Sequence, residues 1–289
     1  MSVEVISPGL WTTIQDRGRT GFEEYGVPEG GVMDRYSAKM ANLLVGNPGD
    51  AALMEITMAG PKLKFNADAL LAVTGINARI FHNGQRQAIN EAFRVRSGDQ
   101  IRIRQVTEGL RVYLAINGGF QTPEILGSRS FFRAITASEK IRKGDKLSVV
   151  DEQPQDENMS ASVKFEKSRY ETSTLTVFPG PEWGELSETV KRDVLQKTFS
   201  ISQKNTRQAY QVKEKIKNNL AAILTQPVLP GTVQLTPAGN MIILMRDAQT
   251  TGGYPRILQL DRQSINVLAQ KRQQDNIYFS MKPYPESAQ

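Results

Sequence analysis

Cysteine is absent from this 289-residue sequence, and histidine occurs once, as His82. Without cysteine the chain can form no disulfide, thiolate nucleophile, iron–sulfur cluster or cysteine-ligated zinc site. One histidine cannot build a multi-histidine metal site, and the two shortages together leave little room for the common nucleophile triads. We therefore expect no metal site in this chain. His82 stands in the run Phe-His-Asn-Gly, which is typical of a hairpin turn and favours an exposed turn histidine over a catalytic base.

Long apolar runs are also missing. No stretch approaches the length needed to cross a bilayer, and the first residues have neither the basic nor the apolar region of a signal peptide. We therefore expect a cytoplasmic protein that makes no membrane contact. Two further motifs are absent: the chain has no G-x-x-x-x-G-K-[ST] phosphate-binding loop and no G-x-S-x-G nucleophile elbow.

Charge of one sign does not dominate either: the chain has 36 Lys and Arg and 30 Asp and Glu, which gives a net charge of +6. The basic residues are scattered, and many alternate with apolar ones, as in residues 101–104 (Ile-Arg-Ile-Arg). That alternation is typical of a strand with one solvated face. No basic stripe with interleaved aromatics is present, so we expect no nucleic-acid binding.

Short strand signals dominate what the sequence does contain. Apolar or β-branched runs occur at residues 70–74, 110–116, 175–178 and 241–245. The first three are followed by Gly75, Gly118 and Pro179, which we expect to end the strands. Short strands between turns are typical of barrels and sandwiches, so the sequence predicts a mainly β protein with a few short helices.

The clearest helix is predicted at residues 35–45. Asp34 precedes it as a good N-cap, because its carboxylate can accept the free N–H groups of the first turn. Gly46 follows it in the position that favours a left-handed residue. The side chains expected to share its buried face are Tyr36, Met40, Leu43 and Leu44. Two further helices are expected at residues 187–197, capped by Ser187, and at residues 264–270.

Lys39 lies inside this first helix, in the tripeptide Ala-Lys-Met. Such tripeptides resemble the sites that carry covalent biotin, but those sites lie on the tips of β-hairpins. The helical position therefore predicts that no biotin is attached to this chain.

Residues 151–171 differ in composition from both sides. The segment begins Asp-Glu-Gln-Pro-Gln-Asp-Glu-Asn and holds few large apolar residues, so it cannot offset its ordering entropy by burial. We interpret it as a polar linker between an N-terminal β unit, residues 1–150, and a C-terminal β unit, residues 172–289. The alternative is a long surface loop within one domain.

Three polar segments hold more turn glycines and hydrogen-bonding groups than packing requires. They are residues 12–21, 26–34 and 246–255. In the first, arginine forks and glycine N–H groups could bind an anion, or an internal Asp–Arg pair could close a turn. In the second, Asp34 could be a ligand or only the helix cap. The third follows a buried strand, a common place for a binding site, although a wide loop would explain it as well.

The same segments carry a resemblance that extends in order along nearly the whole chain. Residues 12–21 (Thr-Thr-Ile-Gln-Asp-Arg-Gly-Arg-Thr-Gly) are similar to the N-terminal signature of the family called allophanate hydrolase subunit 2, KipA or the 5-oxoprolinase C subunit. The similarity continues through residues 26–34, 41–47, 55–57, 60–61, 127–130 and 143–147. In the C-terminal half it covers residues 230–234 (Pro-Gly-Thr-Val-Gln) and 247–255 (Asp-Ala-Gln-Thr-Thr-Gly-Gly-Tyr-Pro).

The resemblance implies two cyclophilin-like β-barrel units and a partner, the KipI-like or allophanate hydrolase subunit 1 protein. Family settings include ATP-dependent 5-oxoproline cleavage to glutamate, the carboxyltransferase part of a biotin-dependent urea-type carboxylase, and antagonism of a kinase inhibitor. We expect the first, in a complex that uses ATP and includes an oxoprolinase-type large subunit. The alternatives are the carboxyltransferase component and a non-catalytic regulator that binds a KipI-like inhibitor.

On this resemblance the site would act on a small amide or carboxylate substrate. The residues predicted as catalytic are Arg207, Tyr210, Gln249 and Tyr254. Those predicted to bind substrate are Gln15, Asp16, Arg19, Asp34, Gln234, Asp247, Thr250, Thr251, Gly252 and Gly253. Arg207 and Arg19 would supply positive charge to an anion or a developing oxyanion.

Two departures from the family pattern bear on activity. A stretch that usually reads Ser-Asn-Arg-Met-Gly-Tyr-Arg-Leu is Asn-Thr-Arg-Gln-Ala-Tyr-Gln-Val at residues 205–212, so Ala209 and Gln211 replace a glycine and an arginine. The usual double glycine before residues 143–145 is absent. These changes leave open a different substrate or a loss of catalysis.

Overall fold

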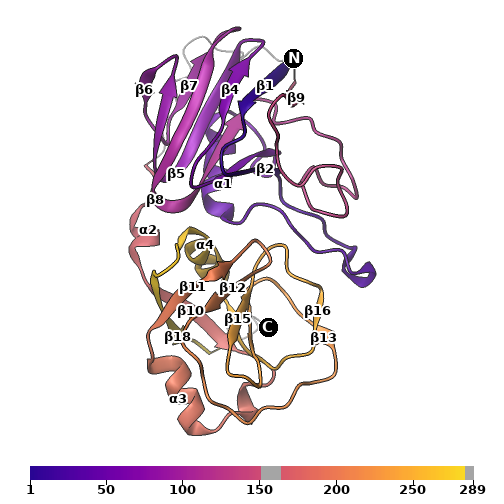
Figure 1. Cartoon of the computed structure of the whole chain (residues 1–289), viewed down its shortest axis with the longest axis vertical. Coiled ribbons are helices and arrows are strands. Elements are labelled where there is room, and N and C mark those ends of the chain that lie inside the picture. Colours follow the sequence, from indigo (N-terminus) through magenta and orange to yellow (C-terminus); the bar gives the residue numbers. More distant parts are fainter. Residues whose placement is uncertain (151–163, 284–289) are drawn as a thin grey trace, which may run out of the picture. The chain divides into compact units, whose positions relative to one another are not determined.

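The computed structural model describes residues 1–150 and 164–283, which form two compact units (Figure 1). The N-terminal unit comprises Met1–Thr20 and Gly30–Lys167, and the C-terminal unit comprises Gly21–Glu29 and Ser168–Gln289. Both are built mainly from strands, which confirms the predicted fold class. Residues 151–163 of the predicted linker lie outside the described residues. Of its remainder, Ser168–Glu171 forms the short helix α2, whose Tyr170 is buried.

The N-terminal unit is a nine-stranded, half-barrel sheet of antiparallel neighbours. Its main path runs β2-β3-β8-β4-β1-β9, and β5 pairs with β6, β7 and β8. Apolar side chains alternate along the strands and meet inside the curve, as Leu63 and Phe65 do on β4. The strands are β1 (Ser2–Ser7), β2 (Trp11–Gln15), β3 (Leu53–Thr57), β4 (Lys62–Phe65), β5 (Ala69–His82), β6 (Gln85–Gln87), β7 (Ala92–Val95), β8 (Gln100–Ile116) and β9 (Lys146–Ser148).

Gly75 does not end its strand, contrary to the prediction. β5 passes through it, and Gly75 pairs with Val112 of β8. Its φ of 148° suits glycine, and a Cβ at this position would lie 2.8 Å from Val112 Cγ1. The glycine is there because two long strands approach closely. The predicted hairpin at His82 is confirmed: β5 and β6 are joined at Asn83 and Gly84, both at positive φ. The His82 ring nitrogen Nε2 also lies 2.7 Å from Asp99 Oδ2, so this half-buried histidine has a partner.

Helix α1 (Arg35–Leu44) packs against β5 and β8 (Figure 1). Asp34 caps it and Gly46 follows it at a φ of 75°, both as predicted. The predicted buried face is correct for Leu44, which is 2% exposed, and wrong for Leu43, which is 49% exposed. With Leu44, the helix buries Ala38 and Ala41 against β-sheet side chains such as Leu70. Small side chains allow the helix backbone to approach the sheet, whereas larger ones would hold it away.

The C-terminal unit contains a closed barrel in the order β10-β17-β14-β15-β12-β11-β18. A parallel pair, β10 with β18, joins the two ends, and all other neighbours are antiparallel. Leu175 and Val177 of β10 point into the core with Ile277 and Phe279 of β18. The barrel strands are β10 (Thr174–Pro179), β11 (Phe199–Asn205), β12 (Ala209–Val212), β14 (Thr232–Leu235), β15 (Met241–Leu244), β17 (Arg256–Leu260) and β18 (Asn276–Met281).

The C-terminal unit also contains smaller elements. Strands β13 (Gln226–Pro227) and β16 (Thr251–Gly252) form a separate two-stranded sheet. Helix α3 (Glu188–Gln196) begins after its predicted cap Ser187, and α4 (Arg262–Gln270) begins two residues before the predicted start, with Asp261 as cap. The 3-10 helices are η1 (Glu23–Tyr25) and η2 (Trp183–Glu185).

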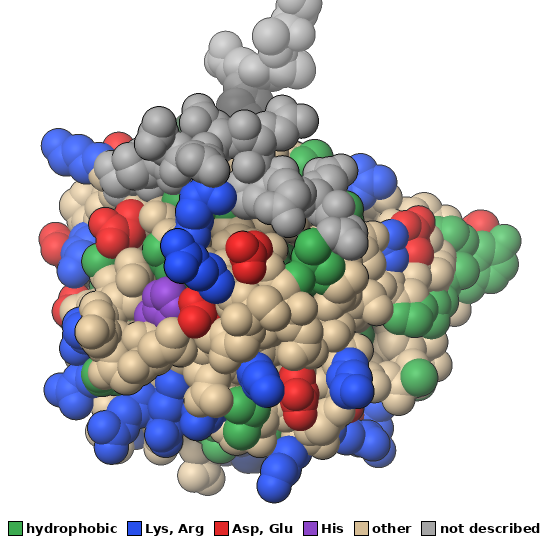
Figure 2. All heavy atoms as spheres, turned by 90° about the horizontal axis from the view of Figure 1, so that it is seen from above, with side chains coloured by type: hydrophobic (Ala, Val, Ile, Leu, Met, Phe, Trp, Pro, Cys, Tyr) green, Lys and Arg blue, Asp and Glu red, His purple; other side chains and the backbone are tan. Residues whose placement is uncertain are grey.

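The surface face in Figure 2 carries basic side chains interspersed with acidic and hydrophobic ones. Across residues 1–150 and 164–283, no helix combines the length and apolarity needed to span a membrane. The cytoplasmic location expected from the sequence stays a prediction.

Candidate functional site

In the C-terminal unit, residues 246–255 connect β15 to β17 and include β16. Their backbone is fixed at several points by neighbouring segments. Gly252 pairs with Gln226 and Thr251 with Pro227 in the two-stranded β13–β16 sheet. The loop carbonyls also accept hydrogen bonds: Val228 N donates to Thr250 O and Ile223 N donates to Gly253 O, both at 2.9 Å. The backbone of this predicted site segment is therefore fixed along its length, and residues 246–255 are called the ribbon below.

Four predicted site residues present their side chains from this ribbon. Gln249, Thr251 and Tyr254 are exposed, with Tyr254 at 41%, and Thr250 is half-buried. Within the described residues, their side-chain polar atoms have no hydrogen-bond partner. An amide, two hydroxyls and a phenol supply both donors and acceptors, which suits a neutral amide or carbonyl ligand.

Arg207 and Asp247 lie beneath this surface and bind each other at two points. Arg207 Nε donates to Asp247 Oδ2 at 2.8 Å, and Arg207 Nη2 donates to Asp247 Oδ1 at 2.9 Å. Their side chains are only 10% and 11% exposed. Asp247 N also donates to Arg207 O at 2.9 Å. The loop after β11 is thus joined to the loop after β15, and the charge of Arg207 is balanced inside the protein.

Gln234, Gly252 and Tyr210 complete the group of predicted residues in this unit. Gln234 of β14 is 1% exposed, and its Nε2 donates to Tyr254 O at 3.4 Å. A Cβ on Gly252 would lie 2.4 Å from Gln234 Nε2, so a larger residue at this position would require the Gln234 amide to shift. Gly253 has more room, since its Cβ would meet only Ile223 O at 3.5 Å. Tyr210 of β12 is fully buried.

In the N-terminal unit, the buried carboxylate of Asp16 organises a loop. It accepts hydrogen bonds from Gly18 N at 2.8 Å and from Ser128 Oγ, Arg129 N and Ser130 Oγ at 2.6 Å each. Burial without such donors would be costly for a carboxylate. The anionic side chain therefore fastens the strand end after β2 to residues 128–130.

The two other predicted residues of this segment have similar contacts. Gln15 Nε2 donates to Thr13 Oγ1 and Phe131 O, each at 3.1 Å. Arg19 is 1% exposed, and it donates from Nε to Ile125 O at 3.1 Å and from Nη2 to Ser130 O at 2.6 Å. Arg17, only two residues away, has a side chain that is 65% exposed.

Asp34 is fully buried at the start of α1. Its Oδ1 accepts hydrogen bonds from Tyr36 N and Ser37 N at 3.1 Å, and its Oδ2 accepts one from Ser37 Oγ at 2.7 Å. Nearby, Glu55 Oε2 accepts from Met33 N at 2.7 Å and from Tyr113 Oη at 3.0 Å. Burial, and then the charge of Glu55, raise the pKa of Tyr113, so the phenol stays protonated and can donate to Glu55. The phenol oxygen also accepts a hydrogen bond from Asp34 N at 2.8 Å.

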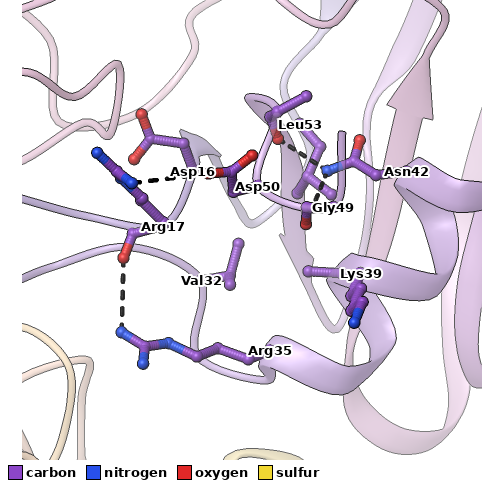
Figure 3. A pocket seen from close by; sticks show the side chains of 11 residues that line it. Asp16, Arg17, Val32, Arg35, Lys39, Asn42, Gly49, Asp50 and Leu53 are labelled. Atoms are coloured by element: carbon purple, nitrogen blue, oxygen red, sulfur yellow. Dashed lines mark hydrogen bonds and ion pairs between the residues drawn. The ribbon is translucent and has the colours of Figure 1, made fainter. Parts of the chain in front are cut away.

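A cavity of about 410 Å³ opens between α1 and the loops after β2 and before β3 (Figure 3). Of the predicted site residues only Asp16 lines it. The other polar residues on its wall were not among those predicted: Arg17, Arg35, Lys39, Asn42 and Asp50. A signal was present in the sequence, since Arg35 and Lys39 lie four residues apart on a helix and so share a face. Across the described residues, no group of three or more His, Asp or Glu side chains could hold a metal ion.

Comparison with known proteins is consistent with this architecture. The 5-oxoprolinase C subunit of Escherichia coli is 30% identical over 278 residues, covering 93% of this chain and 87% of the relative. The urea amidolyase of Lachancea kluyveri is 44% identical over 130 residues, which are 45% of this chain and 7% of the relative.

Solved structures superpose on nearly all of the chain. TTHA0988 matches with a TM-score of 0.86 at 26% identity, covering 96% of this chain and 55% of the other. The urea amidolyase of K. lactis matches with a TM-score of 0.85 at 27% identity, covering 96% of this chain and 18% of the other. The chain thus spans about half of one solved relative and a small part of the other.

The model of the carboxyltransferase domain, subdomain A and B, matches residues 25–281. These matches confirm the family expected from the sequence motifs. The chain belongs to the carboxyltransferase domain family that includes the 5-oxoprolinase C subunit.

Proposed function

We propose that this chain is a subunit of an ATP-dependent amide-cleaving complex and corresponds to the 5-oxoprolinase C subunit. The observation that supports this assignment best is the match along most of both chains to the Escherichia coli protein. In the reaction, water adds across the ring C–N bond of 5-oxoproline and gives glutamate, while ATP is hydrolysed. The chain has no G-x-x-x-x-G-K-[ST] phosphate-binding loop, and ATP would be used by the complex as a whole. The proposed partners are a KipI-like protein and an oxoprolinase-type large subunit.

The ribbon of the C-terminal unit is the proposed substrate-facing surface. Gln249, Thr250, Thr251 and Tyr254 offer unpartnered donors and acceptors from a fixed backbone, an arrangement that keeps the ordering cost of binding low. Beneath them, Arg207, Asp247, Gln234 and Tyr210 would position the ribbon and set its electrostatic environment. Gly252 and Gly253 would allow close approach of the ligand. No side chain of the described ribbon is a strong nucleophile, so another member of the complex would complete the chemistry.

The N-terminal residues have a supporting role in this proposal. Gln15, Asp16, Arg19 and Asp34 are buried and hydrogen-bonded to backbone or hydroxyl groups, and they would hold the loops that border the cavity beside α1.

The test is reconstitution of the complex from this chain, its KipI-like partner and the large subunit, with glutamate release from 5-oxoproline as the readout. Tyr254→Phe and Thr251→Ala should each lower kcat/KM roughly tenfold, the effect of about 1.4 kcal/mol from one lost hydrogen bond. Size-exclusion chromatography should show unchanged assembly. Tyr278→Phe is the matched control, because Tyr278 is an equally exposed tyrosine (39%) on β18. Full activity in both ribbon variants would refute the site.

A second candidate, the carboxyltransferase component of a biotin-dependent urea-type carboxylase, is favoured by the family model and the urea amidolyase matches. A third, a regulator that binds a KipI-like kinase inhibitor, is favoured by the departures at Ala209 and Gln211. Affinity capture of the tagged chain from its native lysate separates the three. A large hydrolase subunit supports the first, a biotin carboxylase the second, and a sensor kinase or the small partner alone the third.

A further inference from the structure

The outer face of the N-terminal sheet carries a row of three cations and one aromatic ring. Leu63 of β4 faces the core, so its neighbour Lys62 lies on the outer face. Lys62 pairs with Arg102 of β8. Arg102 also pairs with Phe81 of β5, which pairs in turn with Arg86 of β6. Residues paired across antiparallel strands have their side chains on the same face, and neighbouring strands lie about 4.8 Å apart. The four side chains therefore stand next to one another across four strands.

A cavity of about 280 Å³ opens over this row. Lys62, Phe81 and Arg102 line it, together with Arg104, which follows two residues later on β8 and so faces the same way. The remaining lining residues are neutral and include Gly84 at the tip of the hairpin. Both arginines are exposed, and Phe81 is half-buried, so part of its ring faces solvent. Among the described residues, the wall of this cavity thus combines three cations and an aromatic ring without a carboxylate.

The acidic residues near the row are engaged elsewhere. Strands β4, β5, β6 and β8 contain a single acidic residue, Glu108, and its Oε1 accepts a hydrogen bond from Asn77 Nδ2 at 2.7 Å. Asp99, which precedes β8, accepts one from Asn83 Nδ2 at 2.6 Å. Glu4 of β1 has a lysine opposite it on each side, one on β4 and one on β9. None of these carboxylates lines the cavity.

The cations of the cavity therefore lack a partner within residues 1–150 and 164–283. No hydrogen bond or ion pair joins the side chains of Lys62, Arg102 and Arg104 to any described residue. Like charges directly opposite each other weaken a pair of strands, and Lys62 and Arg102 are such a pair. Sheet stability does not account for this placement, whereas an anion bound over the row would offset the repulsion.

The aromatic ring narrows the class of anion. Phe81 stands between Arg102 and Arg86, and both a phenyl ring and a guanidinium offer a flat surface on which a nucleobase stacks. Cations beside such a surface are typical of sites that bind nucleotides through their phosphates. A nucleic-acid strand uses several aromatic rings for successive bases, and this row has one. The arrangement therefore suits a single base with several phosphates.

We propose that this cavity binds a nucleoside polyphosphate, with Lys62, Arg102 and Arg104 on the phosphates and Phe81 beside the base. Phe81 and Lys62 are two strands apart, about 10 Å, which leaves room for the ribose between them. The choice of ATP as the nucleotide rests on the proposed function, in which the complex hydrolyses ATP. The sequence hides this site because its residues come from four separate strands, and only the sheet brings the basic and aromatic side chains together.

The direct test is isothermal titration calorimetry on the full chain with Mg²⁺ present. The probes are ATP, inorganic triphosphate, which lacks the base, and adenosine, which lacks the phosphates. We expect ATP to bind at least fivefold more tightly than triphosphate and at least tenfold more tightly than adenosine.

Two variants separate the two parts of the site. Arg102→Gln should weaken the binding of ATP and of triphosphate at least fivefold each. Phe81→Leu should weaken ATP binding at least threefold and leave triphosphate binding unchanged, which also shows that this variant is folded. Arg192→Gln is the matched control, because it removes the same charge from an exposed arginine on α3 of the other unit.

Four outcomes overturn the inference: no binding of ATP, equal affinity for ATP in Arg102→Gln and Arg192→Gln, equal affinity of ATP and triphosphate, and tighter binding of a single-stranded oligonucleotide than of ATP. The proposed function is tested separately by glutamate release from the reconstituted complex. Normal release with an unchanged KM for ATP in Arg102→Gln would keep the function and overturn the site. ATP binding that depends on Arg102, in a complex that releases no glutamate, would keep the site and refute the function.

Discussion

Arg207 and Asp247, 40 residues apart in the sequence, form a buried two-point ion pair with N–O distances of 2.8 and 2.9 Å. The pair fastens the loop after β11 to the start of the proposed substrate-facing ribbon. From the sequence, Arg207 is predicted to supply positive charge to a ligand. In the structure its charge is paired with that of Asp247, so Arg207 would influence a ligand through the position of the ribbon.

Removing one partner of this pair should therefore destabilise the C-terminal unit. Arg207→Met leaves the Asp247 carboxylate buried without its guanidinium, and we expect a loss of roughly 3 kcal/mol in the free energy of unfolding. Urea denaturation followed by tryptophan fluorescence measures it. The double variant Arg207→Met with Asp247→Leu should recover part of the loss, because no charge then stays buried. A single variant as stable as the wild type would contradict the pair's structural role.

Gly252 and Gly253 should respond differently to the same substitution. In Gly252→Ala the new methyl group would meet Gln234 Nε2 at 2.4 Å, which forces the ribbon or the glutamine to move. In Gly253→Ala the nearest atom is Ile223 O at 3.5 Å, an ordinary contact. We expect Gly252→Ala to lower glutamate release by the complex at least tenfold and Gly253→Ala to lower it by less than threefold. Equal effects would show that the contact with Gln234 does not set the ribbon.

Asp34 should matter for the stability of α1. Asp34→Ala removes three hydrogen bonds from the first turn, including those to Tyr36 N and Ser37 N, and should cost about 1–2 kcal/mol. Asp34→Ser keeps a capping oxygen and should recover most of that loss. Chemical denaturation of the full chain gives both values. Unchanged stability in Asp34→Ala would mean that packing of Ala38 and Ala41 alone fixes the helix.

Asp99 should make the N-terminal unit sensitive to acid. Burial opposes its ionisation, but hydrogen bonds from Arg96 N, Asn83 and His82 outweigh burial and hold its pKa at about 2. The folded value lies below the unfolded value of about 3.9, so ionised Asp99 stabilises the fold above pH 4 and loses this effect as the pH falls toward 2. The stability difference between the wild type and Asp99→Asn should thus be largest at neutral pH. Urea titrations at pH 7, 4 and 3 measure it, and a constant difference would contradict the effect.

Local structure and family membership follow from the sequence alone. Asp34 and Gly46 delimit α1, and Asn83 and Gly84 form the hairpin, because caps and turns depend on a few adjacent residues. The alternation of apolar and polar residues indicates the strands. The polar segments at residues 12–21, 26–34 and 246–255 indicate the family, because a motif is recognised from its residues and their order and does not depend on how they pack.

Which polar side chains face solvent is set by tertiary packing. Arg17 and Arg19 are two residues apart in one polar segment, yet the first lines a cavity and the second is buried against carbonyls of residues 125 and 130. Gly75 marks a close approach of β5 to β8 and no chain turn. The partners in each case come from segments that are distant in the sequence, so burial and hydrogen bonding at these positions depend on strand pairing and loop packing, which no local pattern encodes.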